Sequence, residues 1–257
     1  PGTNCEYDMA AAFNRYGGEA EIFVIRNLSA KNMEDSVNEF AKRIENSQMI
    51  AVPGGFSGGD EPEGSAKFIN AFFRNPKIKD AVENMLYARD GLMIGICNGF
   101  QALIKLGLVP FGKIVPLSSE SPTLTYNTIG RHQSQLALTK ICTNKSPWLM
   151  HCKVGEVYNI PISHGEGRFV ASDEVIAKLI ENGQIATQYV DLNGEPTMAL
   201  AYNPNSSMCA IEGIISPDGR VLGKMGHTER ISSDTCVNVD GNKEQLLFKG
   251  GVDYFRI

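Results

Sequence analysis

Long hydrophobic runs, an excess of basic residues and closely spaced cysteine pairs are all absent from this sequence of 257 residues. No apolar stretch approaches the roughly 18 residues that a membrane-spanning helix needs. The formal net charge of −5 provides no basic surface of the kind that binds nucleic acid. The composition therefore predicts a soluble globular protein whose partners include neither a nucleic acid nor a membrane.

The chain also lacks any disulfide or metal-binding pattern. Its cysteines lie at positions 5, 97, 142, 152, 209 and 236, with no C-x-x-C pair and no zinc-like spacing. No signal peptide is recognisable. We therefore expect reduced thiols, no metal ion and a cytoplasmic location.

What the sequence does contain is an alternation of strands and helices. Over the first 106 residues, strands are predicted at 21–26, 49–53 and 92–96, and helices at 6–16, 36–44, 65–73 and 78–88. This order predicts an α/β fold of three layers, in which a mostly parallel sheet is flanked by helices. Binding residues of such sheets cluster at the carboxyl ends of the strands.

From about residue 113, short β-like runs replace this alternation. The clearest lie at 114–117, 136–138, 157–162 and 197–202, and one further helix is expected at 174–181. The Pro217-Asp218-Gly219 turn between two β-like runs predicts a hairpin. We expect this half to add an antiparallel β region to a single domain that spans residues 1–257.

The chain begins in an unusual place for such a fold. Residue 1 is proline, and the first helix, with Asn4 as its expected N-cap, has no strand before it. We therefore expect the chain to be the C-terminal part of a larger polypeptide, or to lack its first residues.

The stretch from Leu92 to Leu106 carries the first candidate for chemistry. A buried strand ends at Cys97 and a helix begins directly after it, in the pattern Gly95-x-Cys97-x-Gly99. This is the layout of a nucleophile elbow, whose glycines leave room for a sharp turn. A thiol at a helix N-terminus faces the positive end of the helix dipole, which favours the reactive thiolate. We therefore expect Cys97 to be a nucleophile, with a buried core cysteine as the alternative.

A cysteine nucleophile needs a proton acceptor, and the chain offers histidines at 132, 151, 164 and 227. His227 follows the second strand of the predicted hairpin. Because residues two apart in extended backbone point to the same side, we expect Glu229 to orient the His227 ring. For this pair on its own, a solvated strand end is the alternative.

Gly54 and Gly55 follow the strand predicted at 49–53. Their N–H groups can approach a substrate carbonyl with no side chain in the way, and with the N–H of Asn98 they can form an oxyanion hole. The stretch is not a P-loop, because no Gly-Lys-Ser/Thr follows it. A glycine loop with a purely conformational purpose is the alternative.

Three motifs together resemble the class I, or triad-type, glutamine amidotransferases, which have a flavodoxin-like fold. They are P-G-G-F-S-G-G-D at 53–60, G-I-C-N-G-F-Q at 95–101 and G-H-T-E-R at 226–230. Further segments at 1–8, 130–134, 146–149 and 164–169 are more similar to the glutaminase of phosphoribosylformylglycinamidine synthase, an enzyme of purine biosynthesis. The chain departs from the family pattern at Gly58, Phe100 and Thr228, where tyrosine, cysteine and proline are usual.

The resemblance implies a catalytic triad of Cys97, His227 and Glu229, with the N–H groups of Gly55 and Asn98 as the oxyanion hole. In this mechanism the thiol attacks the side-chain amide of glutamine, and the imidazole protonates the departing ammonia. Water then hydrolyses the glutamyl thioester to glutamate.

The resemblance also implies substrate-binding residues, which are Gly54, Phe56, Gln101, His164 and Glu166. Gln101 lies one helical turn beyond Cys97, at a position that contacts substrate in related enzymes. For His164 and Glu166, two roles remain open. They bind the amino-acid end of glutamine, or they form a turn at a domain interface.

The implied partner is a synthetase that uses ATP and magnesium to convert formylglycinamide ribonucleotide to its amidine. This synthetase is either a domain of the same polypeptide or a separate subunit. The chain itself is expected to need no cofactor, because it contains no nucleotide-binding signature. It is therefore expected to be the glutamine-hydrolysing component of a ligase.

Three alternatives remain. A cysteine hydrolase of the flavodoxin-like protease and chaperone type shares the elbow, but typically has histidine directly after the cysteine, where this chain has Asn98. An interaction domain with a dead site is disfavoured by the intact Cys97, His227 and Glu229. The glutaminase of another amidotransferase, in the guanylate or carbamoyl-phosphate pathway, shares the triad.

Overall fold

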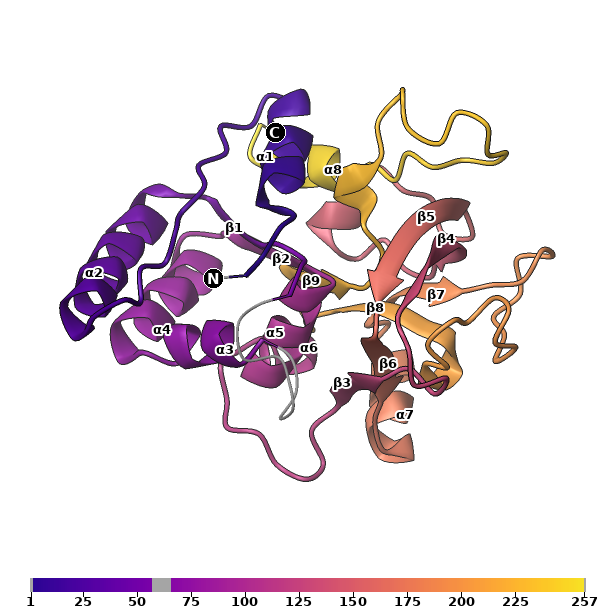
Figure 1. The fold of residues 1–257 in the computed structure, drawn as a ribbon, viewed down its shortest axis with the longest axis horizontal. Helices are drawn as coiled ribbons and strands as arrows, with labels where there is room; N and C mark the ends of the chain where they lie inside the picture. Colours follow the sequence, from indigo (N-terminus) through magenta and orange to yellow (C-terminus); the bar gives the residue numbers. More distant parts are fainter. Residues whose placement is uncertain (1, 57–65, 257) are drawn as a thin grey trace.

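The structure, a computed structural model, describes residues 2–56 and 66–256. Seven strands form one sheet in the order β1-β2-β9-β8-β7-β4-β5, and β3 pairs with β6 in a second sheet (Figure 1). The strands are β1 (Met49–Val52), β2 (Leu92–Ile96), β3 (Thr123–Tyr126), β4 (Gln133–Ile141), β5 (Val157–His164), β6 (Glu166–Val170), β7 (Ile185–Tyr189), β8 (Ile211–Ile215) and β9 (Val221–Lys224). The longer helices are α1 (Glu6–Arg15), α2 (Ala30–Asn46), α3 (Lys67–Phe73), α4 (Pro76–Glu83), α5 (Asn98–Leu106), α7 (Asp173–Glu181) and α8 (Leu247–Tyr254). The shorter helical segments are α6 (Leu108–Phe111), the π-helix η1 (Asn84–Ala88) and the 3₁₀ turns η2 (Pro147–Leu149), η3 (Met208–Ala210) and η4 (Thr228–Arg230).

The seven-stranded sheet changes direction partway across. β1, β2 and β9 run parallel, whereas the pairs from β9 through β8, β7 and β4 to β5 are antiparallel. The predicted hairpin causes this change, because its turn reverses the chain between β8 and β9. The predicted α/β fold and its antiparallel C-terminal region are therefore confirmed, but the sheet is mixed, with fewer parallel pairs than expected.

Helices cover the parallel strands on both sides. In Figure 1, α1 and α8 lie above β1, β2 and β9, and α3, α4 and α5 lie below them. Every residue of β2 is buried, which explains its unbroken apolar sequence. Phe100 of α5 packs so closely on β9 that a Cβ at Gly223 would lie 2.2 Å from its ring. The Phe100 side chain, which stands where the family usually has cysteine, therefore fills the space between α5 and β9.

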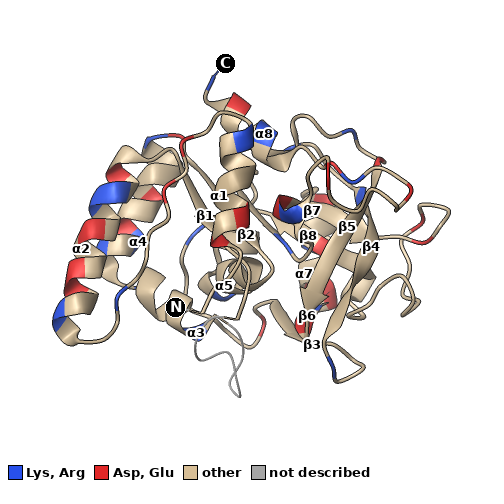
Figure 2. Cartoon of the chain, turned by 45° about the horizontal axis from the view of Figure 1, so that its top comes forward, with Lys and Arg blue, Asp and Glu red and all other residues tan. Residues whose placement is uncertain are grey.

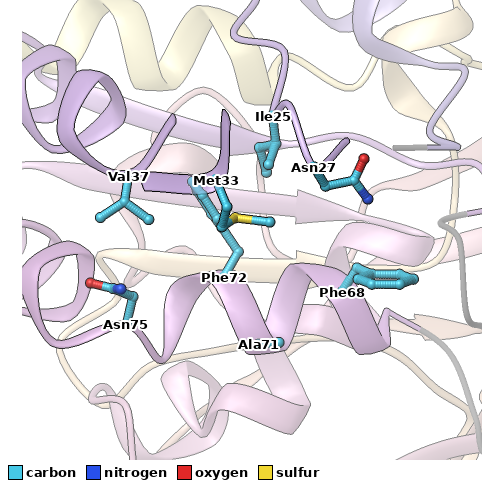
Figure 3. A pocket seen from close by; sticks show the side chains of 8 residues that line it. All are labelled: Ile25, Asn27, Met33, Val37, Phe68, Ala71, Phe72 and Asn75. Carbon is cyan, nitrogen blue, oxygen red and sulfur yellow. The ribbon is translucent and has the colours of Figure 1, made fainter. Parts of the chain in front are cut away.

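The strand predicted at 21–26 is wrong. The backbone N–H of Arg26 bonds the side chain of Ser36 on α2 at 2.9 Å, and the segment pairs with no strand in the part of the chain that the structure describes. Phe23 and Ile25 pack against the core instead. With α2 and α3, this segment encloses an apolar hollow of about 200 Å³ (Figure 3). No residue lining the hollow belongs to the three motifs.

Two further predicted strands, at 114–117 and 197–202, are also wrong, because both segments are coil and turn. In the first, Pro116 removes a backbone donor that a strand would need. In the second, the N–H of Tyr202 donates to the carbonyl of Ala199 at 3.0 Å and closes a turn. The runs at 136–138 and 157–162 do lie in β4 and β5, as predicted.

The two ends of the chain pack together. Phe13 of α1 and Phe248 of α8 meet edge to face, with ring centroids 4.9 Å apart. No helix was predicted in the tail that contains α8. Cys5 rather than Asn4 occupies the N-cap of α1, without a capping bond from its side chain, so the predicted cap is wrong.

Charged residues of both signs lie along the outer side of α2 (Figure 2). Lys31 pairs with Asp35 and Arg43 with Glu39, each one helical turn apart and exposed. Among the described residues, no helix combines the length and the apolar character needed to cross a membrane. The charges on the outer side of α2 therefore belong to a solvated surface, while buried apolar residues form the core.

Candidate active site

Three loops that carry the sequence motifs meet at one edge of the sheet. Gly54 follows β1, Cys97 follows β2, and His227 comes shortly after β9. Ile96 at the end of β2 pairs with Lys224 at the end of β9, so the chain leaves the sheet at neighbouring points. This is the carboxyl edge of the parallel strands, where ligand sites of α/β proteins lie. The predicted meeting of the three loops is therefore confirmed.

Cys97 occupies a sharp turn between β2 and α5. Its φ is +54°, and a positive φ costs a residue other than glycine about 1–3 kcal/mol. A Cβ at Gly95 would lie 2.6 Å from the carbonyl oxygen of Gly99, and a Cβ at Gly99 would lie 2.0 Å from that of Val52. The predicted elbow and its need for two glycines are therefore confirmed.

His227 and Glu229 form a buried pair. The ring Nδ1 and the carboxylate Oε1 are 2.6 Å apart, and each residue is 2% exposed. The backbone differs from the predicted one, because Thr228–Arg230 forms the 3₁₀ turn η4 and not an extended strand end. The predicted contact between imidazole and carboxylate is formed, but a tight turn produces it.

The surroundings of His227 favour its charged form. Burial alone would lower the pKa of the ring, because it penalises the imidazolium. Hydrogen bonds with Cys5, Cys97 and Glu229, together with the charge of Glu229, outweigh burial and raise this pKa well above 6.5. The site therefore stabilises a positive charge next to the Cys97 sulfur, which is what a thiolate nucleophile needs.

Gly54 lies against both reactive side chains and leaves no room for a side chain of its own. A Cβ at Gly54 would lie 2.7 Å from Cε1 of His227 and 3.2 Å from Cβ of Cys97. We predict that Gly54→Ala lowers kcat for glutamine hydrolysis by about 10²-fold, because a displacement of about 1 Å costs that much. Steady-state kinetics measures this loss. Gly155→Ala is the control for a general loss of stability, because a Cβ there would contact nothing within 4 Å although its φ of +90° strains an alanine. Equal losses of kcat in both variants would contradict the steric explanation.

The N-terminal segment pairs with the glycine loop. The N–H of Asn4 donates to the carbonyl of Gly54 at 3.3 Å, and the N–H of Phe56 donates to that of Gly2 at 3.2 Å. Neither bond uses the N–H of Gly55, whose φ of +126° suits glycine. The loop geometry is therefore compatible with the oxyanion role predicted for Gly55, which stays a prediction.

The outer end of this loop is exposed. Phe56 is 63% exposed, and its ring centroid lies 6.1 Å from that of His132. Gly58, where the sequence departs from the family pattern, lies outside the described residues. A substrate-binding role for Phe56 therefore stays a prediction.

Asn98 and Gln101 are buried on the first turn of α5. Nδ2 of Asn98 donates to Oε1 of Gln101 at 2.9 Å, and Nε2 of Gln101 donates to the backbone carbonyl of Glu166. Gln101 therefore ties α5 to the start of β6 and holds Glu166 beside the elbow. A direct contact between Gln101 and substrate stays a prediction.

The end of β5 closes the site opposite the elbow. The Cys97 thiol faces the carbonyl of Ser163 at 3.8 Å, and the next residue, His164, is buried. Burial, together with the charges of His227 and His132, lowers the pKa of His164 to about 3, so its ring is neutral. Both ring nitrogens lack a hydrogen-bond partner among the described residues. A buried polar ring without partners fits the predicted role in binding glutamine, which stays a prediction.

Cys5 is a second thiol at the same imidazole, and no role was predicted for it. Its Sγ lies 3.9 Å from Nδ1 of His227, and Nη2 of Arg230 lies 2.9 Å from that sulfur. Arg230 also pairs with Asp8 of α1 at 3.5 Å. The only signal in the sequence was the family resemblance of residues 1–8. Cys5 and Arg230 thus fasten the N-terminal segment to the turn that carries His227.

Cys5, His227 and Glu229 are the one group among the described residues whose spacing suits a metal ion, with ligand atoms within 4.8 Å of one another. The Arg230 guanidinium lies against Cys5 and would repel a cation. A metal ion would also take Nδ1 of His227 away from Glu229. These donors therefore fit hydrogen bonding within the site better than metal binding.

Comparison with known proteins relates the whole chain to one family. Residues 1–255 match the family described as CobB/CobQ-like glutamine amidotransferase domain. The phosphoribosylformylglycinamidine synthase subunit PurQ of Chlorobium chlorochromatii is 34% identical over 258 residues, which cover 97% of this chain and 92% of the relative. The subunit of that name from Aquifex aeolicus is 33% identical over 242 residues, covering 94% and 92%. A chain in the structure of PurLQS from Thermotoga maritima is similar with a TM-score of 0.69 and 25% identity, covering 99% of this chain and 95% of that one.

Proposed function

This chain belongs to the CobB/CobQ-like glutamine amidotransferase family, and we propose that it is the glutaminase component of phosphoribosylformylglycinamidine synthase. It hydrolyses glutamine to glutamate and ammonia, and the ammonia converts formylglycinamide ribonucleotide to its amidine in purine biosynthesis. One observation carries the chemistry: the thiol of an elbow and a buried imidazole–carboxylate pair meet at the carboxyl edge of β2 and β9.

In the proposed reaction, the Cys97 sulfur attacks the amide carbon of glutamine. The N–H groups of Gly55 and Asn98 stabilise the oxyanion that forms. The His227 imidazolium donates its proton to the departing nitrogen, so ammonia leaves and a glutamyl thioester remains. The neutral ring then accepts a proton from water, which attacks the thioester and releases glutamate. Glu229 holds Nδ1 of the ring throughout.

The amino-acid end of glutamine is proposed to lie between the glycine loop and the end of β5. His164 supports this placement, because its buried ring has two nitrogens without partners and a ligand would satisfy them. Gln101 positions the neighbouring backbone at Glu166. Gly54 and Phe56 are proposed to form the opposite wall.

The acceptor chemistry is proposed to take place on a synthetase partner that binds ATP and magnesium. This chain supplies only the glutaminase, either as a separate subunit, like its PurQ relatives, or as a C-terminal domain of a larger polypeptide. A cytoplasmic location is part of the same proposal, and six free cysteines support it.

The proposal predicts that the chain, assembled with a PurL-type synthetase, makes formylglycinamidine ribonucleotide from glutamine, ATP and formylglycinamide ribonucleotide. Glutamate is expected in equal amount, because each ammonia comes from one glutamine. Mass spectrometry with amide-labelled glutamine follows the nitrogen into the amidine. The assignment would be contradicted if formylglycinamide ribonucleotide did not stimulate glutamate release and the acceptor substrate of another amidotransferase did.

A cysteine hydrolase acting on peptides is the other enzyme class with this elbow. Such an enzyme cleaves peptides without free glutamine, so incubation with a peptide library separates the two functions. We expect no peptide cleavage.

A further inference from the structure

Lys224 is a lysine with no exposed surface, at the end of β9 and three residues before His227. Its Nζ donates to Oγ1 of Thr228 at 2.8 Å and to Oε1 of Gln245 at 2.8 Å, and it lies 3.7 Å from Oε1 of Glu212. The three donors of the ammonium therefore have three oxygen neighbours. The reaction proposed above does not use this group.

The same network reaches the backbone on both sides of His227. Before the histidine, Glu212 accepts from the N–H of Gly226 at 2.5 Å and from a threonine hydroxyl of β7. After it, Lys224 holds the side chain of Thr228. His227 thus lies between Gly226 and Thr228. Glu212 and Lys224, the two members of a buried ion pair, hold these neighbours in place.

Thr228 stands where the family pattern has proline. A proline ring fixes the backbone φ at the first position of a helical turn, whereas threonine does not. Here the Thr228 hydroxyl accepts from Lys224 and donates to Oε1 of Gln245 at 2.9 Å. Hydrogen bonds from a buried lysine therefore supply the constraint that the missing ring would give.

The ammonium also compensates negative charge behind the site. Burial lowers the pKa of Lys224, and the carboxylates of Glu212 and Glu229 oppose this shift. A buried charge persists only when it is paired and hydrogen-bonded, and both conditions hold here. Lys224 therefore supports the carboxylate that orients the His227 ring.

We propose that Lys224 is a positioning residue of the glutaminase reaction, which holds residues 226–229 so that the His227 ring faces the Cys97 sulfur. The inference rests on the proposed function, because it concerns the same imidazole. It adds a residue that acts through the turn and touches no substrate.

The test uses Lys224→Met, which keeps the length of the side chain and removes the ammonium. Because the turn can then shift, kcat for glutamine hydrolysis in the complete enzyme is expected to fall by about 10²-fold while KM stays nearly constant. Adding Thr228→Pro is expected to restore part of the lost kcat, because the ring fixes φ again. The restoration is expected to be partial, because proline lacks the N–H that Thr228 donates to the carbonyl of Gly226 at 3.1 Å. If Lys224→Met does not fold, the double variant Lys224→Met with Glu212→Gln, which removes both buried charges, is tested instead.

The control is Leu179→Ala on α7, a buried residue outside the site, which lowers the melting temperature but is expected to leave kcat unchanged. A purely stabilising role for Lys224 gives no loss of kcat and no rescue by Thr228→Pro, and either result overturns the inference. A wild-type enzyme that does not hydrolyse glutamine overturns the proposed function instead.

Discussion

Replacing Cys97 with alanine is expected to lower glutamine hydrolysis by at least about 10⁴-fold, because no other group at the elbow can form the thioester. Cys97 lies at a positive φ between β2 and α5, and the glycines two residues before and after it leave no room for a Cβ. The variant keeps the fold, since it removes only one sulfur from a site that is already tightly packed. Glutamate release, measured with the complete enzyme, gives the loss.

Two comparisons make this result specific. Ammonia supplied in place of glutamine is expected to support amidine synthesis by the Cys97→Ala enzyme at the wild-type rate, because the synthetase partner is untouched. Cys5→Ala is the matched control, since Cys5 is also a buried thiol next to His227 but lies on its Nδ1 side. If Cys5→Ala abolishes glutamine hydrolysis and Cys97→Ala does not, the nucleophile is assigned to the wrong cysteine.

Glu229→Gln is expected to lower kcat by about 10³–10⁴-fold, because an amide cannot hold the ring of His227 in its charged form and orientation. The hydrogen bond with Nδ1 and the negative charge of Glu229 both contribute to the raised pKa of His227. Without them this pKa falls. Since the active form carries an imidazolium, the alkaline limb of the pH profile of kcat/KM is expected to move to lower pH.

The same shift has a consequence for stability. A pKa raised above 6.5 in the folded state stabilises the fold fully below pH 6.5, and this contribution is lost as pH rises through the raised value. The difference in unfolding free energy between wild type and Glu229→Gln is therefore expected to be largest at acid pH. Two results together would contradict this role of the carboxylate. The alkaline limb of Glu229→Gln would match that of wild type, and the difference in unfolding free energy between the two enzymes would not vary with pH.

The local parts of the site could be predicted because neighbours in the chain determine them. Glycines on both sides of Cys97 permit one sharp turn, and the buried apolar strand before it is too short for a helix. The Pro217-Asp218-Gly219 turn places β8 beside β9, and the pairing of β9 with β2 brings His227 to the edge that holds Cys97. The elbow and the hairpin turn depend on local spacing alone.

The parts that could not be predicted depend on contacts across the fold. The segment 21–26 has the composition of a strand, but packing on α2 and α3 takes the place of a strand partner. Cys5 reaches the catalytic turn only after folding, from the cap of the first helix. Lys224 likewise meets Glu212 and Gln245 only across the fold. The 3₁₀ turn at Thr228–Arg230, which brings Glu229 to the His227 ring, is likewise not evident from the spacing of the two residues.

The most direct test of the central claim is covalent labelling with a chloroketone analogue of glutamine, followed by peptide mass spectrometry. We expect one adduct, on Cys97, whose formation glutamine blocks and which the Glu229→Gln enzyme forms more slowly. A label on Cys5 alone, or labelling of Cys97 that glutamine does not affect, would contradict the claim that this thiol and the His227–Glu229 pair form one glutamine site.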